Sequence, residues 1–528
     1  MTERGRTVIR GAELADGSGG PLTRGDLLVS DGRITAVSPA DAYDLVDAEV
    51  VEADGLVVAP GFIDVHSHAD NAPLQAEDDT SKILQGVTTE VVGNCGFSLA
   101  PVEPVTETML ATFSQRIFPP LRWGWHSFAE FLTAADAGGY VTNYAPLIGH
   151  GTLRLAVLGM ADRGPNEGEA ARMGRLLDEA LDAGAFGMST GLIYPPGVFS
   201  ATDELIALAK RLPDDRVYAT HMRSEGAGLF DSIDEAVEIG RQAGCRVQIS
   251  HLKAAGRSNW GQVGEALERL DRARRDGVAV TQDVYPYDRS STMLTACLPP
   301  WFQEGGDAAA LSRLEDPVML ARARADIEGP NAGNSHVAGA GYDGILVSST
   351  ASHRFEARTL TEIAGELGIE PFDALVHVLR AEQLRASMVT ALMSEPDVET
   401  VMAHPLTMIG TDGLPPGTGG RPHPRLFGTF PRVLGHYVRD RSVLSLPAAV
   451  AQMTALPAKV FGLPDRGRIA AGAVADLIAF DPRRISDVCD YRNPVHRPVG
   501  IAWVMQAGQF TVRNGQWLGK RLGRRLTP

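Results

Sequence analysis

The chain has 528 residues, of which 44% are hydrophobic, so the sequence predicts a globular protein that is too long for one ordinary hydrophobic core. A formal net charge of −16 argues against nucleic-acid binding, because phosphates are bound by basic surfaces. No stretch reaches the ~18 apolar residues of a membrane span, and the N-terminal residues do not read as a signal peptide, so we expect no membrane partner.

The N-terminal segment predicts the first part of a small β domain. Residues 7–11, 25–30 and 33–37 are short β-rich pieces separated by turns. Asp31-Gly32, between the last two of them, is a strong hairpin-turn signal.

The middle of the chain alternates strand-like apolar runs with helical segments rich in Ala, Leu, Glu and Arg. The predicted strands are 57–65, 88–93, 145–149, 184–190, 217–221, 246–251, 278–284 and 407–412. The predicted helices include 166–183, 202–211, 231–243 and 261–275. This alternation predicts an α/β fold with a parallel sheet, and the number of strands favours a closed (β/α)8 TIM-like barrel. A doubly wound open sheet is the alternative, but no Gly-rich phosphate turn follows an early strand.

A long segment rich in Pro and Gly, residues 286–346, separates barrel strands 7 and 8. We interpret it as an insertion over the barrel mouth. Gly413–Gly420, after the eighth strand, reads as a mobile loop over the site; it lacks the GxxxxGK[ST] pattern of a phosphate cradle.

The C-terminal segment is β-rich again, with predicted strands at 469–472, 475–480, 501–505 and 510–513 and a turn at Asn514-Gly515. We expect both termini to form one β-sandwich. The predicted domains are 1–59 (sandwich, first part), 60–460 (barrel with insertion) and 461–528 (sandwich, second part). The basic cluster at the end of the chain, Lys520, Arg521, Arg524 and Arg525, reads as a solvated tail.

Metal-ligand residues occupy the ends of several barrel strands. His66 and His68 follow the first strand with Ser67 between them, so both imidazoles point to the same side. Other strand ends carry Cys95, His221, His251 and Asp412. Barrel enzymes place their chemistry at these ends, and His, Cys and carboxylate are the ligands that zinc prefers, so the pattern predicts a zinc site.

Longer motifs surround these residues in order along the chain: GFIDVHSH, VVGNCGFSLAP, STGLIYPPG, THMRSEG, SHLKAAG, DVYPY and GTDGLPPGTGGRPHPRLFGTFPRVLG. In these stretches the sequence resembles the N-acyl-D-amino-acid deacylases (D-aminoacylases) of the amidohydrolase superfamily. The resemblance covers residues 5 to 515 and is loose only at 286–346. A later stretch, GRIAAGAVADLIAFDP, resembles the closing segment of amidohydrolases in general.

The resemblance implies zinc-dependent hydrolysis of N-acyl-D-amino acids to a carboxylate and a free D-amino acid. Cys95, His221 and His251 would hold one tightly bound Zn²⁺. Cys95 would also frame a second, weaker position with His66, His68 and Asp412, in place of the carbamylated lysine of many amidohydrolases. Asp412 is the expected general base, which takes a proton from water and returns it to the leaving amine.

The carboxylate of such a substrate requires cationic partners, for which we expect Arg425 and Lys253. The resemblance adds polar contacts from Tyr194, Tyr285 and Ser290 (or Ser291). His150 is either a further polar group of the site or a buried core histidine. The apolar residues Met293, Leu294 and Leu298 favour neutral or hydrophobic D-amino acids.

Three alternatives stay open. An N-acyl-D-Glu or N-acyl-D-Asp deacylase shares the same motifs. A cyclic amidase (hydantoinase- or dihydropyrimidinase-like) is disfavoured because the fourth strand, 184–190, lacks a bridging lysine. A catalytically inactive binding protein is disfavoured by the complete ligand set.

The remaining cysteines, Cys245, Cys297 and Cys489, lie far apart without a CxxC pair, which favours a reducing cytoplasm over a disulfide framework. The expected partner is a small-molecule substrate, an N-acyl amino acid. The protein is expected to be a monomer or a homo-oligomer.

Overall fold

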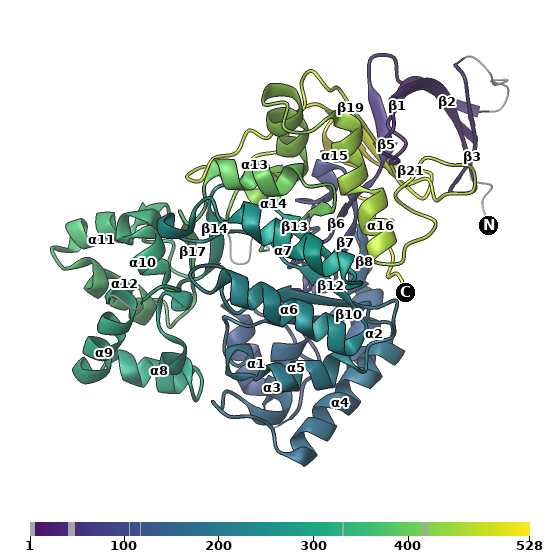
Figure 1. The fold of residues 1–528 in the computed structure, drawn as a ribbon. Coiled ribbons are helices and arrows are strands. Elements are labelled where there is room, and N and C mark those ends of the chain that lie inside the picture. Colours follow the sequence, from purple (N-terminus) through teal and green to yellow (C-terminus); the bar gives the residue numbers. More distant parts are fainter. Residues whose placement is uncertain (1–5, 41–47, 105, 117, 330–331, 415–419) are drawn as a thin grey trace.

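The structure is a computed structural model that describes residues 6–40, 48–104, 106–116, 118–329, 332–414 and 420–528. Its middle contains two parallel sheets surrounded by helices (Figure 1). The smaller sheet has the order β6-β7-β8, with bounds Phe62–Asp64, Val87–Val92 and Asn143–Pro146. The larger has the order β18-β13-β12-β11-β10-β9. From β9 to β18 its strands are Ile148–Gly149, Gly187–Gly191, Val217–His221, Arg246–Ile249, Val280–Val284 and Thr407–Ile409.

The two parallel sheets meet at both sides. β8 runs into β9 through Leu147, whose N–H donates to the Val92 carbonyl at 2.9 Å. On the other side, Ser67 and Gly413 form an isolated parallel bridge just beyond β6 and β18. Buried apolar residues of both sheets, such as Val91 and Val217, share one hydrophobic cluster.

Helices follow most of these strands, as the sequence predicts. They are α1 (Glu107–Ser114), α2 (Phe128–Gly138), α3 (His150–Leu158), α4 (Glu167–Asp182), α5 (Thr202–Ala209), α6 (Leu229–Ala243), α7 (Val263–Arg275), α13 (Glu395–Ala403), α14 (Arg425–Arg432), the π-helical η8 (Val433–Asp440), α15 (Leu446–Met453) and α16 (Ala455–Val460). The α4 helix begins with a capping box, in which Asn166 and Glu169 satisfy each other's backbone N–H groups. Among the described residues, no helix is both long and apolar enough to cross a membrane.

The segment between β13 and β18 forms its own lobe, seen at the left of Figure 1. It contains the antiparallel sheet β14-β17-β15-β16 (Ser290–Met293, Ala386–Thr390, Ile345–Thr350 and Arg358–Thr359). Its helices are α8 (Asp307–Leu314), α9 (Pro317–Glu328), α10 (His336–Ala340), α11 (Leu360–Leu367) and α12 (Pro371–Ala381). The lobe has a separate hydrophobic cluster and continues to Thr390, past the limit of 346 expected from the sequence. The boundary was placed too early because α11 and α12 have the same amphipathic pattern as crossover helices.

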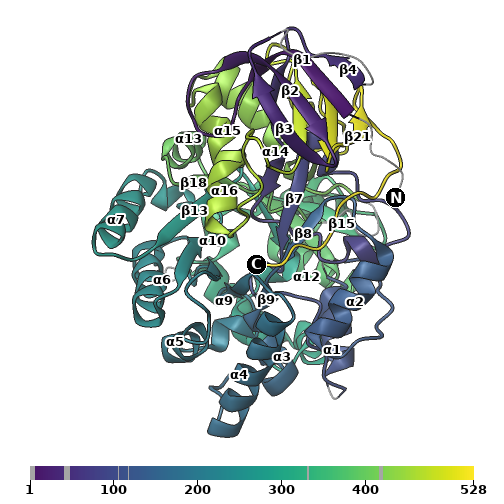
Figure 2. The ribbon, with the colours of Figure 1, turned by 90° about the vertical axis from the view of Figure 1, so that its right-hand side faces the viewer.

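Strands from both ends of the chain share one nine-stranded sheet of order β22-β21-β20-β19-β5-β1-β2-β3, with β4 paired to β1. From the N-terminus these strands are β1 (Arg6–Leu14), β2 (Thr23–Ser30), β3 (Arg33–Ser38), β4 (Ala48–Glu52), β5 (Val57–Pro60), β19 (Leu477–Phe480), β20 (Ile501–Gln506), β21 (Gln509–Arg513) and β22 (Gln516–Trp517). Figure 2 shows this sheet at one end of the molecule. Asp31 and Gly32 both have positive φ (51° and 79°), as a two-residue hairpin turn requires.

The predicted strand at 469–472 is wrong. The segment is a turn that makes only scattered backbone hydrogen bonds: Ile469 donates to Asp16 at 3.0 Å and Gly472 donates to Ile34 at 2.7 Å. Gly472 has φ 89°, which is incompatible with a strand.

The interpretation of the C-terminus as a solvated tail is also wrong. Arg521 pairs with Asp78 at 2.6 Å and Arg525 with Asp136 at 2.9 Å. The tail pairs with the start of β8, where the Leu526 N–H donates to Tyr144 at 2.8 Å. The Leu526 side chain joins the buried cluster of the parallel strands, so the final residues help to close the core.

Candidate active site

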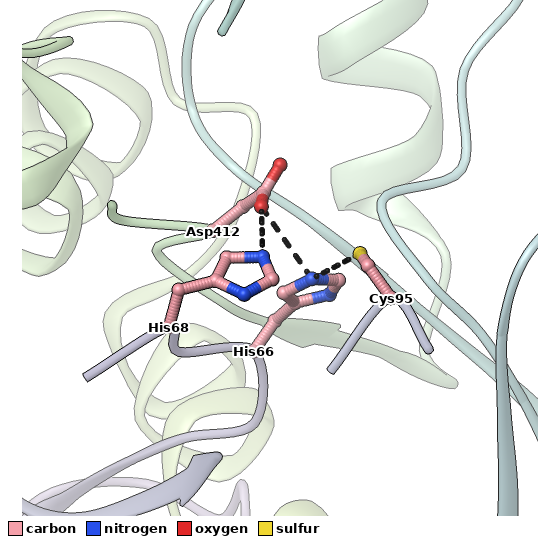
Figure 3. Close-up of side chains that lie close together, drawn as sticks. All are labelled: His66, His68, Cys95 and Asp412. Atoms are coloured by element: carbon pink, nitrogen blue, oxygen red, sulfur yellow. Dashed lines mark hydrogen bonds and ion pairs between the residues drawn. The ribbon is translucent and has the colours of Figure 1, made fainter. Parts of the chain in front are cut away.

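The predicted metal-ligand residues converge in space. The ligand atoms of His66, His68, Cys95 and Asp412 lie within 4.8 Å of one another (Figure 3). Those of Cys95, His221 and His251 form a second group, of three residues, within the same distance of one another. Cys95 belongs to both groups, so the two potential metal positions share its sulfur.

Three of these residues have a left-handed backbone, which non-glycine residues rarely adopt. The φ angles are 54° at Cys95, 37° at His251 and 47° at Asp412. Each residue comes just after its strand, and the surrounding structure holds the conformation. The Asp412 N–H donates to the His66 carbonyl at 2.7 Å, and the His251 N–H donates to Asp283 at 2.8 Å. Such strain is typical of functional positions.

The Cys95 sulfur lies among three imidazoles: 3.3 Å from His66 Nε2, and 3.7 Å from both His221 Nδ1 and His251 Nε2. Burial alone would raise the pKa of the Cys95 thiol, but His66 and the hydrogen bonds of the other imidazoles hold it well below its usual range. The site therefore favours a thiolate, the form in which cysteine binds metals.

Two carboxylates lie behind the imidazoles. Glu225 Oε1 is 2.8 Å from His251 Nδ1, and Asp283 Oδ1 is 3.4 Å from His66 Nδ1. Carboxylates in this position fix the orientation of metal-binding histidines. Neither residue was predicted from the sequence, although Asp283 stands near the end of a predicted strand, as the candidate ligands do.

A buried ion-pair network holds the backbone at His66 and at Thr411, the residue before Asp412. Asp64 accepts hydrogen bonds from the backbone of both His66 (3.1 Å) and Thr411 (2.8 Å), which links β6 to β18. Burial raises the pKa of Asp64 to about 6 despite the nearby Lys82. Lys82 also pairs with Glu90 at 3.1 Å.

Asp412 has a histidine on one side and an arginine on the other. Its Oδ1 lies 3.1 Å from His68 Nε2, and its Oδ2 lies 2.8 Å from Arg425 Nη1. Burial would raise the pKa of Asp412, but Arg425 and His66 hold it well below its usual range. The carboxylate is therefore ionised, as a general base must be.

All of the candidate ligand residues except His66 line one pocket, which opens to solvent at its mouth. Of the predicted substrate-binding residues, Lys253, Tyr194, Tyr285 and Ser290 line it. Lys253 pairs with Glu225 and lies 2.8 Å from His251 Nδ1.

Arg425 lies behind Tyr285 and is not among the lining residues. Its side chain is 1% exposed, with the guanidinium 4.5 Å from the Tyr285 ring centroid. Its Nη2 donates to the Ser291 carbonyl at 3.0 Å. Within the described structure, Arg425 Nε and the Tyr285 hydroxyl are buried without a hydrogen-bond partner.

Other predicted residues have different roles. His150 lies 2.8 Å from Glu204 and does not line the pocket. Met293 lines the pocket, whereas Leu294 and Leu298 pack in the core of the lobe. Of the predicted loop 413–420, residues 415–419 lie outside the described residues, and Leu414 lines the pocket.

Six further lining residues were not predicted from the sequence: four apolar residues, one threonine and one histidine. They are Phe97, Phe113, Thr152, Leu155, Ile193 and His336. Phe97 is part of the GNCGF stretch that carries Cys95 and could have been identified there. Phe113 and His336 come from α1 and α10, which no strand-end pattern marks.

Comparison with known proteins agrees with this geometry. The model of the amidohydrolase family (Amidohydro_3) matches residues 49–512. The chain is 38% identical to the D-aminoacylase of Alcaligenes xylosoxydans xylosoxydans, over 98% of this chain and 97% of that protein. It is 36% identical to the N-acyl-D-aspartate deacylase of the same organism, over 98% and 93%. A crystal structure of N-acyl-D-glutamate deacylase from Bordetella bronchiseptica, with zinc and a phosphonate inhibitor, superposes with a TM-score of 0.82 at 34% identity, covering both chains completely. The chain belongs to the N-acyl-D-amino-acid deacylase (D-aminoacylase) family of the amidohydrolases.

Proposed function

We propose that this protein is a metal-dependent enzyme that hydrolyses N-acyl-D-amino acids to a carboxylate and a free D-amino acid. The observation that carries the proposal is the shared sulfur: Cys95 joins two groups of ligand atoms at a pocket that also contains Lys253 and Tyr285. Full-length relatives with this activity in their names support it.

The donor set fits zinc. Thiolate, imidazole and carboxylate are its usual ligands, and His66 and His251 each have a carboxylate facing the ring nitrogen that points away from Cys95. We propose that Cys95, His221 and His251 hold the tightly bound ion, and that His66, His68 and Asp412 frame a second position with Cys95. Zinc in such a site polarises the scissile carbonyl and makes a hydroxide nucleophile available near neutral pH.

The protein's own residues then orient the substrate and move the proton. Asp412 takes the proton of the attacking water and returns it to the leaving amine. Lys253, Tyr194, Tyr285 and Ser290 contact the substrate carboxylate. Arg425 acts from behind Tyr285, where its charge lies beside Asp412 and the Tyr285 ring. The Tyr285 hydroxyl is buried without a partner and can donate to the carboxylate directly, because a buried unsatisfied donor costs about 1–3 kcal/mol until a ligand satisfies it.

The substrate side chain is proposed to be neutral. A D-Glu or D-Asp substrate carries a second carboxylate, which requires a second cation, but Lys253 is the one lysine or arginine among the described lining residues. This composition favours the D-aminoacylase activity over the acidic-substrate alternatives.

The fold is consistent with this chemistry. We propose that the two parallel sheets act as one closed (β/α)8 barrel within residues 60–460, with the ligands at the carboxyl ends of its strands. The nine-stranded sheet, from 1–59 and 461–528, would form the small β-sandwich.

The proposal is tested by incubating the purified protein with N-acetyl amino acids of both hands and measuring the amine released. We expect turnover of neutral D-substrates and much less of their L-enantiomers. Absence of turnover with all D-substrates, in protein shown to contain zinc, would refute the proposal.

A further inference from the structure

The pocket has two chemically different halves. Lys253 and Tyr285 follow β12 and β13, whereas Phe97 and Leu155 follow β7 and β9. In the larger parallel sheet, β11 separates β12 and β13 from β10 and β9. His221, at the end of β11, therefore lies between a polar half, which holds the Lys253–Glu225 ion pair, and an apolar half.

The segment that begins with β14 extends from one half to the other. At Ser291, the backbone carbonyl accepts from Arg425 at 3.0 Å. At Thr292, the hydroxyl lies 2.8 Å from the Tyr194 hydroxyl. Three residues further, the Thr295 hydroxyl lies 3.3 Å from Nη1 of Arg116, just after α1.

We name the apolar half the acyl arm and define it by Phe97, Phe113, Thr152, Leu155 and Met293. All of them line the pocket and are at most 7% exposed. The Phe97 and Phe113 rings pack against each other, with centroids 5.5 Å apart and planes tilted by 43°.

Among the five described residues that define the acyl arm, the one side-chain polar group, the Thr152 hydroxyl, is already paired. The Thr152 hydroxyl donates to the Ser98 carbonyl at 2.9 Å and accepts from the Ser98 N–H at 2.9 Å. The guanidinium of Arg116 packs against Phe113, but it is bound to Gln303 at 2.7 Å and Asp307 at 2.6 Å. A charged or strongly polar ligand group would lose its hydration in this arm without compensation.

The chemistry of the amide decides which part of the substrate enters the acyl arm. The carboxylate lies on the amine side of the scissile carbonyl, and the acyl chain lies on its other side. With the carboxylate held by Lys253 and Tyr285 and the carbonyl at the ligand cluster, the acyl chain extends into the opposite half. Building on the proposed function, we propose that the enzyme selects N-acyl-D-amino acids whose acyl group is apolar and longer than acetyl.

The test compares kcat/KM for one neutral D-amino acid carrying acetyl, butanoyl, hexanoyl, succinyl and carbamoyl groups. Burial of each methylene should raise kcat/KM about fourfold, so we expect at least a tenfold gain from acetyl to butanoyl. Succinyl and carbamoyl substrates should be worse than butanoyl and acetyl, respectively. A flat profile, or a preference for acetyl, would overturn the acyl proposal and leave the deacylase function intact. No turnover of any D-substrate would overturn both.

Matched variants locate the selectivity. Leu155→Phe adds bulk inside the acyl arm, and should lower the butanoyl-to-acetyl ratio at least fivefold. Leu158→Phe makes the same change on the same helix at a residue outside the lining, and should leave the ratio unchanged. Phe113→Ala lengthens the arm and should move the optimum to a longer chain, which provides a second test if Leu155→Phe folds poorly. Equal butanoyl-to-acetyl ratios in all three variants and the wild type would refute the assignment of these residues to acyl binding.

Discussion

Replacing Arg425 by alanine removes a guanidinium that is 1% exposed and lies 2.8 Å from Asp412. The buried Asp412 carboxylate then loses its arginine partner, and the substrate carboxylate loses a cation. Loss of a charged partner of the bound substrate carboxylate costs about 2–5 kcal/mol of binding energy, which corresponds to a decrease in kcat/KM of roughly 30- to 5,000-fold. Arg425→Lys should recover only part of it, because lysine lacks the planar fork.

The assay uses two substrates, an N-acetyl-D-amino acid and the matching N-acetyl amine without the carboxylate. The wild type should process the second poorly, and Arg425→Ala should lose much less on it than on the first. Arg432→Ala on the same helix is the control. Arg432 lies over the Tyr287 ring, 4.9 Å from its centroid, and the variant should lose the same factor on both substrates.

The pH profile gives an independent readout. Arg425 helps to hold the pKa of Asp412 well below its usual range, so its removal should raise that pKa. Activity requires the ionised base, and the acid limb of kcat/KM should therefore move to higher pH in Arg425→Ala. Equal losses on both substrates with an unchanged acid limb would refute the reasoning and assign Arg425 to the fold.

Four further predictions concern the ligands, the core and pH. Cys95→Ala should lose most of its bound zinc, because both ligand groups share this sulfur; unchanged zinc by metal analysis would contradict the assignment. Asp412→Asn should keep the zinc held by the other group but lose turnover by about 10²- to 10⁴-fold, and a kcat within a few-fold of wild type would indicate a different base. Leu526→Ala should cost about 2 kcal/mol of stability, seen as a lower melting temperature, whereas Leu518→Ala, at a residue that is 41% exposed, should cost little; equal shifts would argue against a buried tail. Burial lowers the pKa of His336 to about 4. The contribution of the neutral imidazole to the stability of the fold is therefore complete above its ordinary pKa of 6.5 and is lost as the pH falls towards 4. His336→Gln should lose less stability than the wild type between pH 6.5 and 4, and melting temperatures that fall in parallel would argue against the shift.

The strand ends were predictable because the signals are local. An apolar run followed by His, Cys or Asp marks each position, and all of the metal-ligand residues predicted in this way converge in the structure. The supporting carboxylates were not predictable in the same way. Glu225 contacts His251 across 26 residues, and Asp283 contacts His66 across 217, so no local pattern pairs them.

Errors in the sequence predictions have physical causes. Ile469 and Ala470 have strand-like composition, but the turn at Gly472 allows only scattered hydrogen bonds. The C-terminal arginines read as solvated because their partners, Asp78 and Asp136, are distant in sequence. The end of the lobe was predicted at residue 346, too early, because an amphipathic helix has the same sequence pattern whether it covers a barrel or another sheet.

The most direct measurement is hydrolysis of an N-acetyl-D-amino acid and its L-enantiomer by the same protein, first after removal of metal with a chelator and then after addition of zinc. The structure predicts that the metal-free protein is inactive on both and that zinc restores turnover of the D-substrate, with little of the L-substrate. Turnover that is independent of metal, or a preference for the L-enantiomer, would contradict a metal-dependent D-amino-acid deacylase built around Cys95.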